Sequence, residues 1–368
     1  FTQEQRVKAW LKANMTTHKY FTNLHDIGRV WNLALKYRIK RAFIVYFFKT
    51  VIPVYCRRIH NSLAWRWPRL RNCIIFRISL IIATLLGLPG VKFGWFGIRA
   101  SRKCKKAGCD DLAYGLSINP VSCVRYFEFD FARRMLPRNL KGRCLDVSSP
   151  RLFSAYMLAQ NPDLQMDIIN PDTSDLEETG DLLRSLGISS ERYGLHNIYA
   201  DKLPWEDRAF DYIWSISVIE HIPEQQDIIT LKEIERVLKF NGLLLLTFPV
   251  AGKSQDEFRE EDVYGLNKVQ KDEERVFFQR WYDDSMQRDR IVSQLEKMEI
   301  IAQEIWCERQ ADWLENYFVN YRKNGLKTAS WDPVYMLKYF KRCFAMQGEL
   351  FAGIKCVCFR KMKSGDMA

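Results

Sequence analysis

The sequence has 368 residues, of which 47% are hydrophobic and 27% charged, and this balance excludes a mainly disordered or fibrous protein. Its net charge of +12 is unevenly distributed: residues 1–110 contain 22 Lys/Arg and three acids, whereas residues 111–368 contain 34 Lys/Arg and 41 Asp/Glu. This asymmetry predicts a basic segment that contacts a polyanion, followed by an ordinary folded domain.

The ten cysteines are scattered along the chain. No CxxC pair and no spacing typical of zinc ligands occurs, and a chain of this length can build its own hydrophobic core. We therefore expect reduced thiols, no bound metal and a protein that faces the cytosol.

The basic segment contains two apolar runs, residues 42–55 and 74–91, after a stretch of helical periodicity at 27–35. Three interpretations stay open: helices that lie in a membrane interface, an extension packed on the following domain, and a spanning segment. The second run is shorter than the roughly 20 residues of a spanning helix, and Arg77 at mid-membrane would cost about 2.5–3.5 kcal/mol. The interface is favoured, so we expect residues 27–106 to contact an anionic membrane surface. Long aliphatic runs favour lipid over nucleic acid as the polyanion.

From residue 143 onward, strand patterns alternate with helical ones, which predicts a parallel sheet covered by helices on both faces. An Asn241-Gly242 turn is expected to lead into a central buried strand. The predicted helices are 151–160, 173–187 and 226–238, and the predicted strands are 143–147, 165–169, 193–200, 210–215, 243–248, 300–306 and 351–359.

Three stretches carry a family resemblance: RCLDVSSPRLFSAYMLA, LPWEDRAFDYIWSISVIEHIPE and LKEIERVLKFNGLLLLTFP. Together they resemble class I S-adenosyl-L-methionine (SAM)-dependent methyltransferases of the branch that acts on small molecules, lipids and sugars. The resemblance covers roughly residues 140–249 and implies an α/β, Rossmann-like sheet of seven strands, with SAM as cofactor. It implies a methyltransferase-like domain at 111–368, with substrate or lid insertions at 250–299 and 308–350, after a basic, aromatic, helical extension at 1–110.

The resemblance also implies where the cofactor contacts lie. Asp146 matches the acid of the first strand, although it could instead cap the following turn. The glycines of the family loop are replaced by Ser148, Ser149 and Pro150, which predicts a stiffer and more crowded loop. At the ends of the next two strands, Asn170 and Tyr199 occupy the positions of family acids, and Asp172 is a possible substitute for the first of them. The cofactor candidates are Asp146, Ser148, Ser149, Asn170, Asp172, Tyr199, Ala200, Asp201 and Ser215.

Glu220 and His221 are candidates for acid–base catalysis, because histidine titrates near neutrality. The alternative is that this pair supports the loop after the fourth strand. Within the first insertion, FFQRWYDDSM resembles a segment of methyltransferases from polysaccharide and secondary-metabolite pathways. Arg280, Trp281 and Tyr282 would then line a pocket for a polar substrate. Alternatively, the two acids that follow start a helix, where the helix dipole favours them. The aromatic stretch 313–351 predicts a lid or an oligomer interface.

The leading hypothesis is SAM-dependent methyl transfer to an oxygen or nitrogen of a small, lipid-linked or glycan-like acceptor, peripherally on the cytoplasmic face of a membrane. The departures at Ser148, Asn170 and Tyr199 motivate an alternative, an inactive methyltransferase-fold scaffold or partner-binding subunit. A weaker alternative is an RNA methyltransferase whose basic segment binds phosphates.

Overall fold

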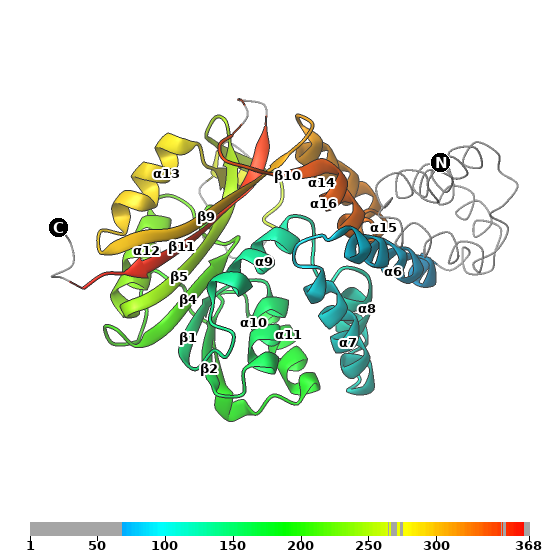
Figure 1. Ribbon diagram of the computed structural model, residues 1–368, viewed down its shortest axis with the longest axis horizontal. Coiled ribbons are helices and arrows are strands. Elements are labelled where there is room, and N and C mark those ends of the chain that lie inside the picture. Colours follow the sequence, from blue (N-terminus) through cyan, green and yellow to red (C-terminus); the bar gives the residue numbers. More distant parts are fainter. Residues whose placement is uncertain are drawn as a thin grey trace, which may run out of the picture. The chain divides into compact units, whose positions relative to one another are not determined.

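An eight-stranded sheet forms the centre of the fold in the computed structural model (Figure 1), which describes residues 68–263, 265, 271–272, 275–346, 348 and 351–363. The strand order is β10-β9-β11-β5-β4-β1-β2-β3, and the five strands from β5 to β3 run parallel. The strands are β1 (Gly142–Val147), β2 (Leu164–Ile169), β3 (Tyr193–His196), β4 (Phe210–Ile216), β5 (Leu238–Ala251), β9 (Met298–Glu308), β10 (Phe340–Cys343) and β11 (Ala352–Lys361).

The α/β, Rossmann-like fold is therefore confirmed, with one strand more than predicted. The additional strand, β10, pairs antiparallel with β9 at the edge of the sheet. It lies within residues 308–350, which the family resemblance predicts as a substrate or lid insertion. The expected apolar features at 27–35 and 42–55 lie outside the described residues.

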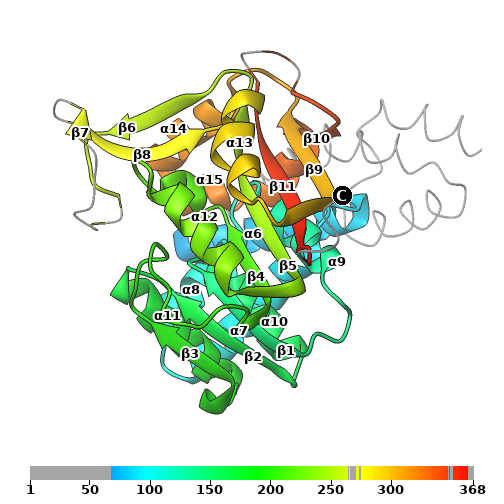
Figure 2. The same ribbon diagram turned by 90° about the vertical axis from the view of Figure 1, so that its left-hand side faces the viewer.

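Helices cover both faces of the sheet, as Figures 1 and 2 show. They are α6 (Pro68–Leu86), α7 (Val91–Lys106), α8 (Asp110–Ile118), α9 (Arg125–Met135), α10 (Arg151–Gln160), α11 (Thr173–Leu186), α12 (Gln226–Val237), α13 (Asp284–Arg290), α14 (Trp313–Asn324), α15 (Leu326–Ala329) and α16 (Asp332–Tyr339). Short 3-10 turns occur at η3 (Ser190–Arg192), η4 (Ile219–His221) and η5 (Val292–Gln294). A separate three-stranded sheet joins β6 (Gln255–Arg259), β8 (Arg275–Trp281) and β7 (Lys271–Asp272).

The strands separate two hydrophobic cores because their side chains alternate between the faces. In β1, Cys144 faces the aromatic core under α6–α11, whereas Leu145 faces the aliphatic core under α12. In the aromatic core, the rings of Phe153 and Trp214 pack edge to face with centroids 5.4 Å apart. Cys356 and Cys358 both lie in that same core, as their spacing on one strand predicts.

Two predicted boundaries are wrong. The expected Asn241-Gly242 turn is a bulge inside one long strand: β5 advances from Leu238 to Leu243 while its neighbour β4 advances only from Phe210 to Tyr212. Asn241 takes a left-handed φ of 61°, so the chain bends without losing its pairing with β4. The strand predicted to reach Ala200 ends at His196, because its neighbour β2 offers its last partner, Ile169, there.

The described part of the basic segment forms α6 and α7, and residues Asn72–Ala368 make one compact unit. The predicted division after residue 110 therefore falls inside this unit. Phe76 and Leu80 of α6 are fully buried in the aromatic core, together with Phe93 of α7. Within the described residues, no helix combines the length and apolarity needed to cross a membrane.

The turn between α6 and α7 allows a test of how closely α9 packs against it, because two glycines of the turn differ in the space available for a Cβ atom. Gly87 and Gly90 both have left-handed φ angles, 77° and 72°. A Cβ on Gly87 would meet nothing within 4 Å, whereas one on Gly90 would lie 2.0 Å from the Tyr126 carbonyl oxygen. Gly87→Ala should cost about 1–2 kcal/mol of unfolding free energy from backbone strain alone. Gly90→Ala should cost at least about 2 kcal/mol more, because α9 must also move. Urea denaturation of both variants measures the difference, and equal losses would contradict this close approach.

Candidate functional site

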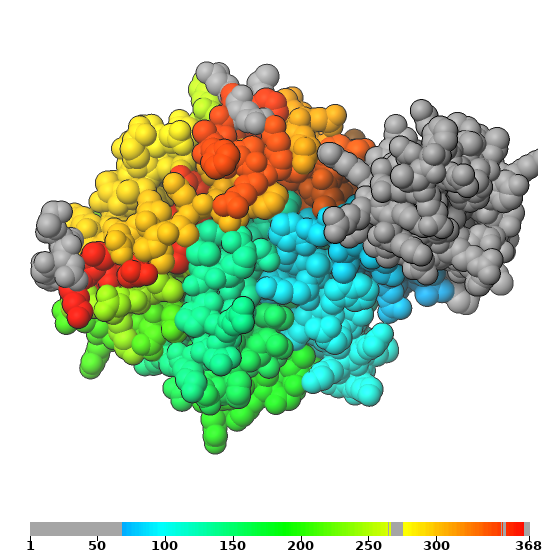
Figure 3. Space-filling model, viewed as in Figure 1, coloured from blue at the N-terminus to red at the C-terminus, as the bar shows by residue number. Residues whose placement is uncertain are grey.

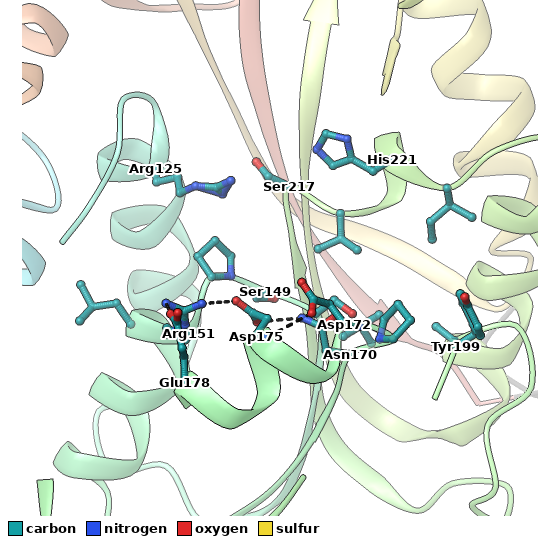
Figure 4. A pocket seen from close by; sticks show the side chains of 18 of the residues that line it. Arg125, Ser149, Arg151, Asn170, Asp172, Asp175, Glu178, Tyr199, Ser217 and His221 are labelled. Atoms are coloured by element: carbon teal, nitrogen blue, oxygen red, sulfur yellow. Dashed lines mark hydrogen bonds and ion pairs between the residues drawn. The ribbon is translucent and has the colours of Figure 1, made fainter. Parts of the chain in front are cut away.

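A pocket of about 590 Å³ opens beside the carboxyl ends of β1, β2 and β4 (Figure 4). Open α/β sheets bind their ligands at this edge, and small-molecule sites commonly have volumes of this order. The turn after β1 and the loops after β2 and β3 contribute one part of its lining. The segment from α8 to the start of α9, the loop after β4 and Phe277 of β8 contribute the other part.

Asp146 at the end of β1 holds the turn that follows it. Its carboxylate is fully buried and accepts hydrogen bonds from the Ser149 backbone N–H (2.9 Å) and the Ser154 hydroxyl. Trp214 Nε1 in turn donates to the Ser154 oxygen at 3.0 Å. Burial raises the pKa of Asp146 to about 6. Asp146 does not line the pocket, so its contacts are those of the turn-capping interpretation.

Ser148, which stands where the resemblance predicts a glycine, takes a left-handed backbone conformation. Its φ is 52°, a left-handed value that costs an L-residue some strain. Its backbone N–H (2.9 Å) and its hydroxyl (3.0 Å) both donate to the Ile169 carbonyl oxygen of β2. Ser149 joins the loop to β4 by accepting from the Ile216 N–H at 3.0 Å. Ser148–Pro150 therefore line the pocket and leave it open, although the substitutions predict crowding.

Asn170 and Asp172 follow β2 and both line the pocket, but they differ in how many of their side-chain polar atoms already form hydrogen bonds within the protein. Asn170 uses both of its polar atoms, because Oδ1 accepts from the Asp172 N–H and Nδ2 donates to Asp175. Asp172 caps α11 through Oδ1 alone, which accepts from the N–H groups of Ser174 and Asp175. Asp172 Oδ2 makes no hydrogen bond to any described residue, so Asp172 is the better placed acceptor for a ligand hydroxyl.

Tyr199, Ala200 and Asp201 also line the pocket, in the loop that follows β3. Asn197 fixes the start of this loop by donating to the carbonyl oxygens of Asn170 and Pro171. Ser215, the remaining cofactor candidate, is fully buried in β4 and lies outside the lining.

Glu220 and His221 lie close together, but only one of them reaches the pocket. His221 lines the pocket, whereas Glu220 is buried behind it, with its Oε1 3.8 Å from His221 Nε2. His221 Nδ1 lies 2.7 Å from the Phe278 carbonyl oxygen, which can only accept, so this nitrogen carries the ring proton. Burial lowers the pKa of His221 to about 4 and raises that of Glu220 to about 8. Both groups are therefore neutral near pH 7.

The residues predicted to bind substrate lie outside this pocket. Arg280 is buried and pairs with Asp227 (3.0 Å) and Asp256 (3.1 Å). Tyr282 is fully buried, and Trp281 Nε1 donates to Glu257 at 3.2 Å.

The alternative interpretation of that segment is confirmed. Asp283 caps α13 by accepting from the Met286 N–H at 2.8 Å. The described residues of the aromatic stretch 313–351 contribute no side chain to the pocket lining. In the part of the chain that the structure describes, no group of three or more His, Cys, Asp or Glu side chains could hold a metal ion.

Sequence reasoning missed Arg125, Ser217 and Phe277, which all line the pocket. Ser217 has a φ of 52°, and its hydroxyl donates to Glu128 Oε1 at 2.6 Å. Glu128 is fully buried on α9 and also accepts from the Thr247 hydroxyl. A signal was present, because an ionisable residue such as Glu128 in an aromatic helix requires a buried partner.

Residues 145–246 match the model of a family described as a methyltransferase domain. No sequence among curated proteins is significantly similar to this chain. Among solved structures, the [4+2]-cyclase SpnF is 18% identical with a TM-score of 0.40, over 64% of this chain and 79% of its own. The YcgJ protein from Bacillus subtilis is 14% identical with a TM-score of 0.41, over 65% and 100%. Geranyl diphosphate C-methyltransferase from Streptomyces coelicolor is 9% identical with a TM-score of 0.41, over 65% and 78%.

The match to the methyltransferase-domain model and the order of strands and helices confirm the class I SAM-dependent methyltransferase resemblance. They support SAM as the cofactor. The residues present fit such a group, since the turn after β1 leaves the pocket open and Asp172 keeps one carboxylate oxygen for a hydroxyl ligand.

Glu220 allows a test of the site's electrostatics. Its pKa in the folded state, about 8, lies above the ordinary value of 4.5, so the folded protein keeps a proton that the unfolded chain releases. Wild-type stability should therefore decrease as the pH rises from about 5 to 8. Glu220→Gln removes this pH-dependent loss. The unfolding free energy of the variant, relative to that of wild type, should therefore increase by roughly 1–4 kcal/mol as the pH rises from about 5 to 8. Glu296→Gln, at an exposed position just before β9, is the control. A difference between Glu220→Gln and wild type that does not change with pH would contradict the burial of an isolated carboxyl group.

Proposed function

We propose that this chain, with a class I methyltransferase domain at residues 145–246, transfers a methyl group from SAM to an oxygen or nitrogen of a small acceptor. The observation that carries the proposal is that one pocket joins two chemically different parts. The first consists of Ser148–Pro150, Asp172 and Tyr199, and the second contains Arg125, Ser217 and His221. A group-transfer enzyme needs such adjoining sites for donor and acceptor.

In the cofactor part, Asp172 Oδ2 would accept hydrogen bonds from ribose hydroxyls, and Tyr199 offers a half-exposed ring beside it. When bound, SAM supplies a methyl group activated by its positively charged sulfur. In the acceptor part, His221 can take up the proton that a hydroxyl or amine acceptor releases. Its pKa of about 4 makes it a weak base. Positioning by the walls of the pocket therefore carries the larger share of the rate enhancement.

The Asp172→Asn variant tests the cofactor site. Asparagine caps helices as well as aspartate does, so α11 should stay intact. The pocket-facing oxygen, however, is replaced by an amide N–H donor or becomes an uncharged amide oxygen. Hydrogen bonds to a charged group contribute about 1.5–3 kcal/mol, so we expect S-adenosylhomocysteine (SAH) to bind about 10–100-fold more weakly. Isothermal titration measures this, and Asp163→Asn, at an exposed position, should bind as wild type does.

If wild type fails to bind SAH or SAM at millimolar concentration, the enzyme proposal is wrong. The partner-binding alternative then becomes the better account. If Asp172→Asn binds as tightly as wild type, the assignment of the ribose contact is wrong while the enzyme proposal stands.

We further propose that the acceptor is lipid-linked or glycan-like and that the protein acts peripherally on the cytoplasmic face of a membrane. The outer side of α6 supports this proposal, because four large apolar side chains are exposed there: Leu70 (43%), Ile78 (37%), Ile81 (46%) and Leu85 (50%). Arg77 is exposed beside them, and residues 1–110 contain only three acids. An apolar face within a strongly basic segment complements an anionic lipid surface.

Vesicle flotation tests this surface. Wild type should bind vesicles of phosphatidylcholine that contain about 30% phosphatidylserine. It should bind less at high salt, because screening weakens the attraction. The double change Ile81→Ser and Leu85→Ser should reduce binding at least about fivefold, since burial of each side chain contributes of order 1 kcal/mol. Ile229→Ser, which removes an exposed apolar side chain from α12, is the matched control. Binding that the double change leaves intact would contradict the role of α6. Salt-sensitive RNA binding without vesicle binding would favour the RNA alternative.

A further inference from the structure

Arg125 occupies a fixed position in the acceptor part of the pocket. It is the first residue of α9, and the loop before it is tied to a distant segment. The Cys123 N–H donates to Asp332 Oδ2 at 2.8 Å, and Asp332 Oδ1 accepts from the Tyr317 hydroxyl at 2.8 Å. Asp332 is fully buried, so this connection between α9 and α16 is shielded from water. Figure 3 shows the surface on this side of the molecule, where segments coloured orange lie directly against segments coloured cyan and teal.

Arg125 has no ion-pair partner among the residues that the structure describes, although other charged side chains line the same pocket. Arg151 also lines the pocket, but it pairs with Asp175 and Glu178. Arg125 forms no ion pair with any described residue, and its Nη1 is buried without a hydrogen-bond partner among them. In Figure 4 its guanidinium projects into the pocket on the side of Ser217 and His221.

Nearby acids do not satisfy these donors. Glu128, one turn along α9, accepts from the hydroxyls of Ser217 and Thr247 through Oε1. It brings a negative charge behind the wall of the pocket but no hydrogen bond to Arg125. Glu220 is protonated near neutral pH, because burial raises its pKa to about 8. Arg125 Nη1 is therefore left without a hydrogen-bond acceptor among the described residues.

We propose that Arg125 binds an oxyanion group of the acceptor, a carboxylate or a phosphate, so that the substrate class of this pocket is a small anionic molecule. A guanidinium presents parallel N–H donors that match two oxygens of such a group. Phe277, mostly buried at the same pocket, offers an apolar surface to the rest of the molecule. That the bound anion is the methyl acceptor rests on the proposed function, but the binding of an anion at Arg125 can be tested by itself.

Three aromatic probes of similar shape isolate the charge: benzoate, phenyl phosphate and the uncharged benzamide. Their dissociation constants are measured by titration into the full chain, with and without saturating SAH. Wild type should bind at least one of the anions about tenfold or more tightly than benzamide. The better anion distinguishes a carboxylate from a phosphate as the recognised group.

Arg125→Gln should abolish this preference, and Arg125→Lys should keep only part of it, because lysine retains the charge without the planar fork. Arg138→Gln, at an exposed position beyond the end of α9, is the matched control and should behave as wild type does. Unchanged SAH binding by Arg125→Gln shows that the variant is folded.

Two results would overturn the inference: no preference for either anion in wild type, or a preference that persists in Arg125→Gln. If SAH binds while the preference is absent, methyl transfer stands and the anionic acceptor is wrong. If the preference depends on Arg125 but SAH does not bind, the anion site stands and the enzyme proposal is wrong.

Discussion

The buried carboxylate of Asp146 is the constraint on which the pocket depends. It turns the chain away from β1 by accepting from the Ser149 N–H, and it connects that turn to α10 through the Ser154 hydroxyl. Trp214 of the neighbouring strand donates to the same hydroxyl, so β1, α10 and β4 are joined at one point in the core. A carboxyl group in this position costs desolvation, which raises its pKa, but the hydrogen bonds offset part of that cost.

Two serines complete the opening at this edge of the sheet. Ser148 follows β1 and Ser217 follows β4, and each has a φ of 52°. In both residues a hydrogen bond from the side-chain hydroxyl stabilises this unfavourable conformation. Ser148 donates to the Ile169 carbonyl oxygen, and Ser217 donates to Glu128. Because strained residues persist only where neighbours fix them, the two bends are parts of the site's construction.

The sequence predicted the strands and helices between residues 143 and 248 well, because buried parallel strands and amphipathic helices have strong and different periods. It also indicated Ser148, Ser149, Asn170, Asp172, Tyr199 and His221, all of which line the pocket. It misplaced Arg280, whose charge is satisfied by Asp227 and Asp256, because pairing between distant segments leaves no local pattern. Arg125 was missed for the same reason: its exposure to the pocket depends on how α9 packs over the sheet.

The tie between Cys123 and Asp332 has a consequence for any shortened form of the protein. One wall of the pocket precedes the segment that matches the methyltransferase-domain model, and the residue that anchors this wall comes after it. A fragment trimmed to residues 140–250 would keep the floor of the crevice but lack both the α8–α9 wall and its anchor. The minimal unit able to select a ligand is thus set by a contact that spans more than half of the sequence.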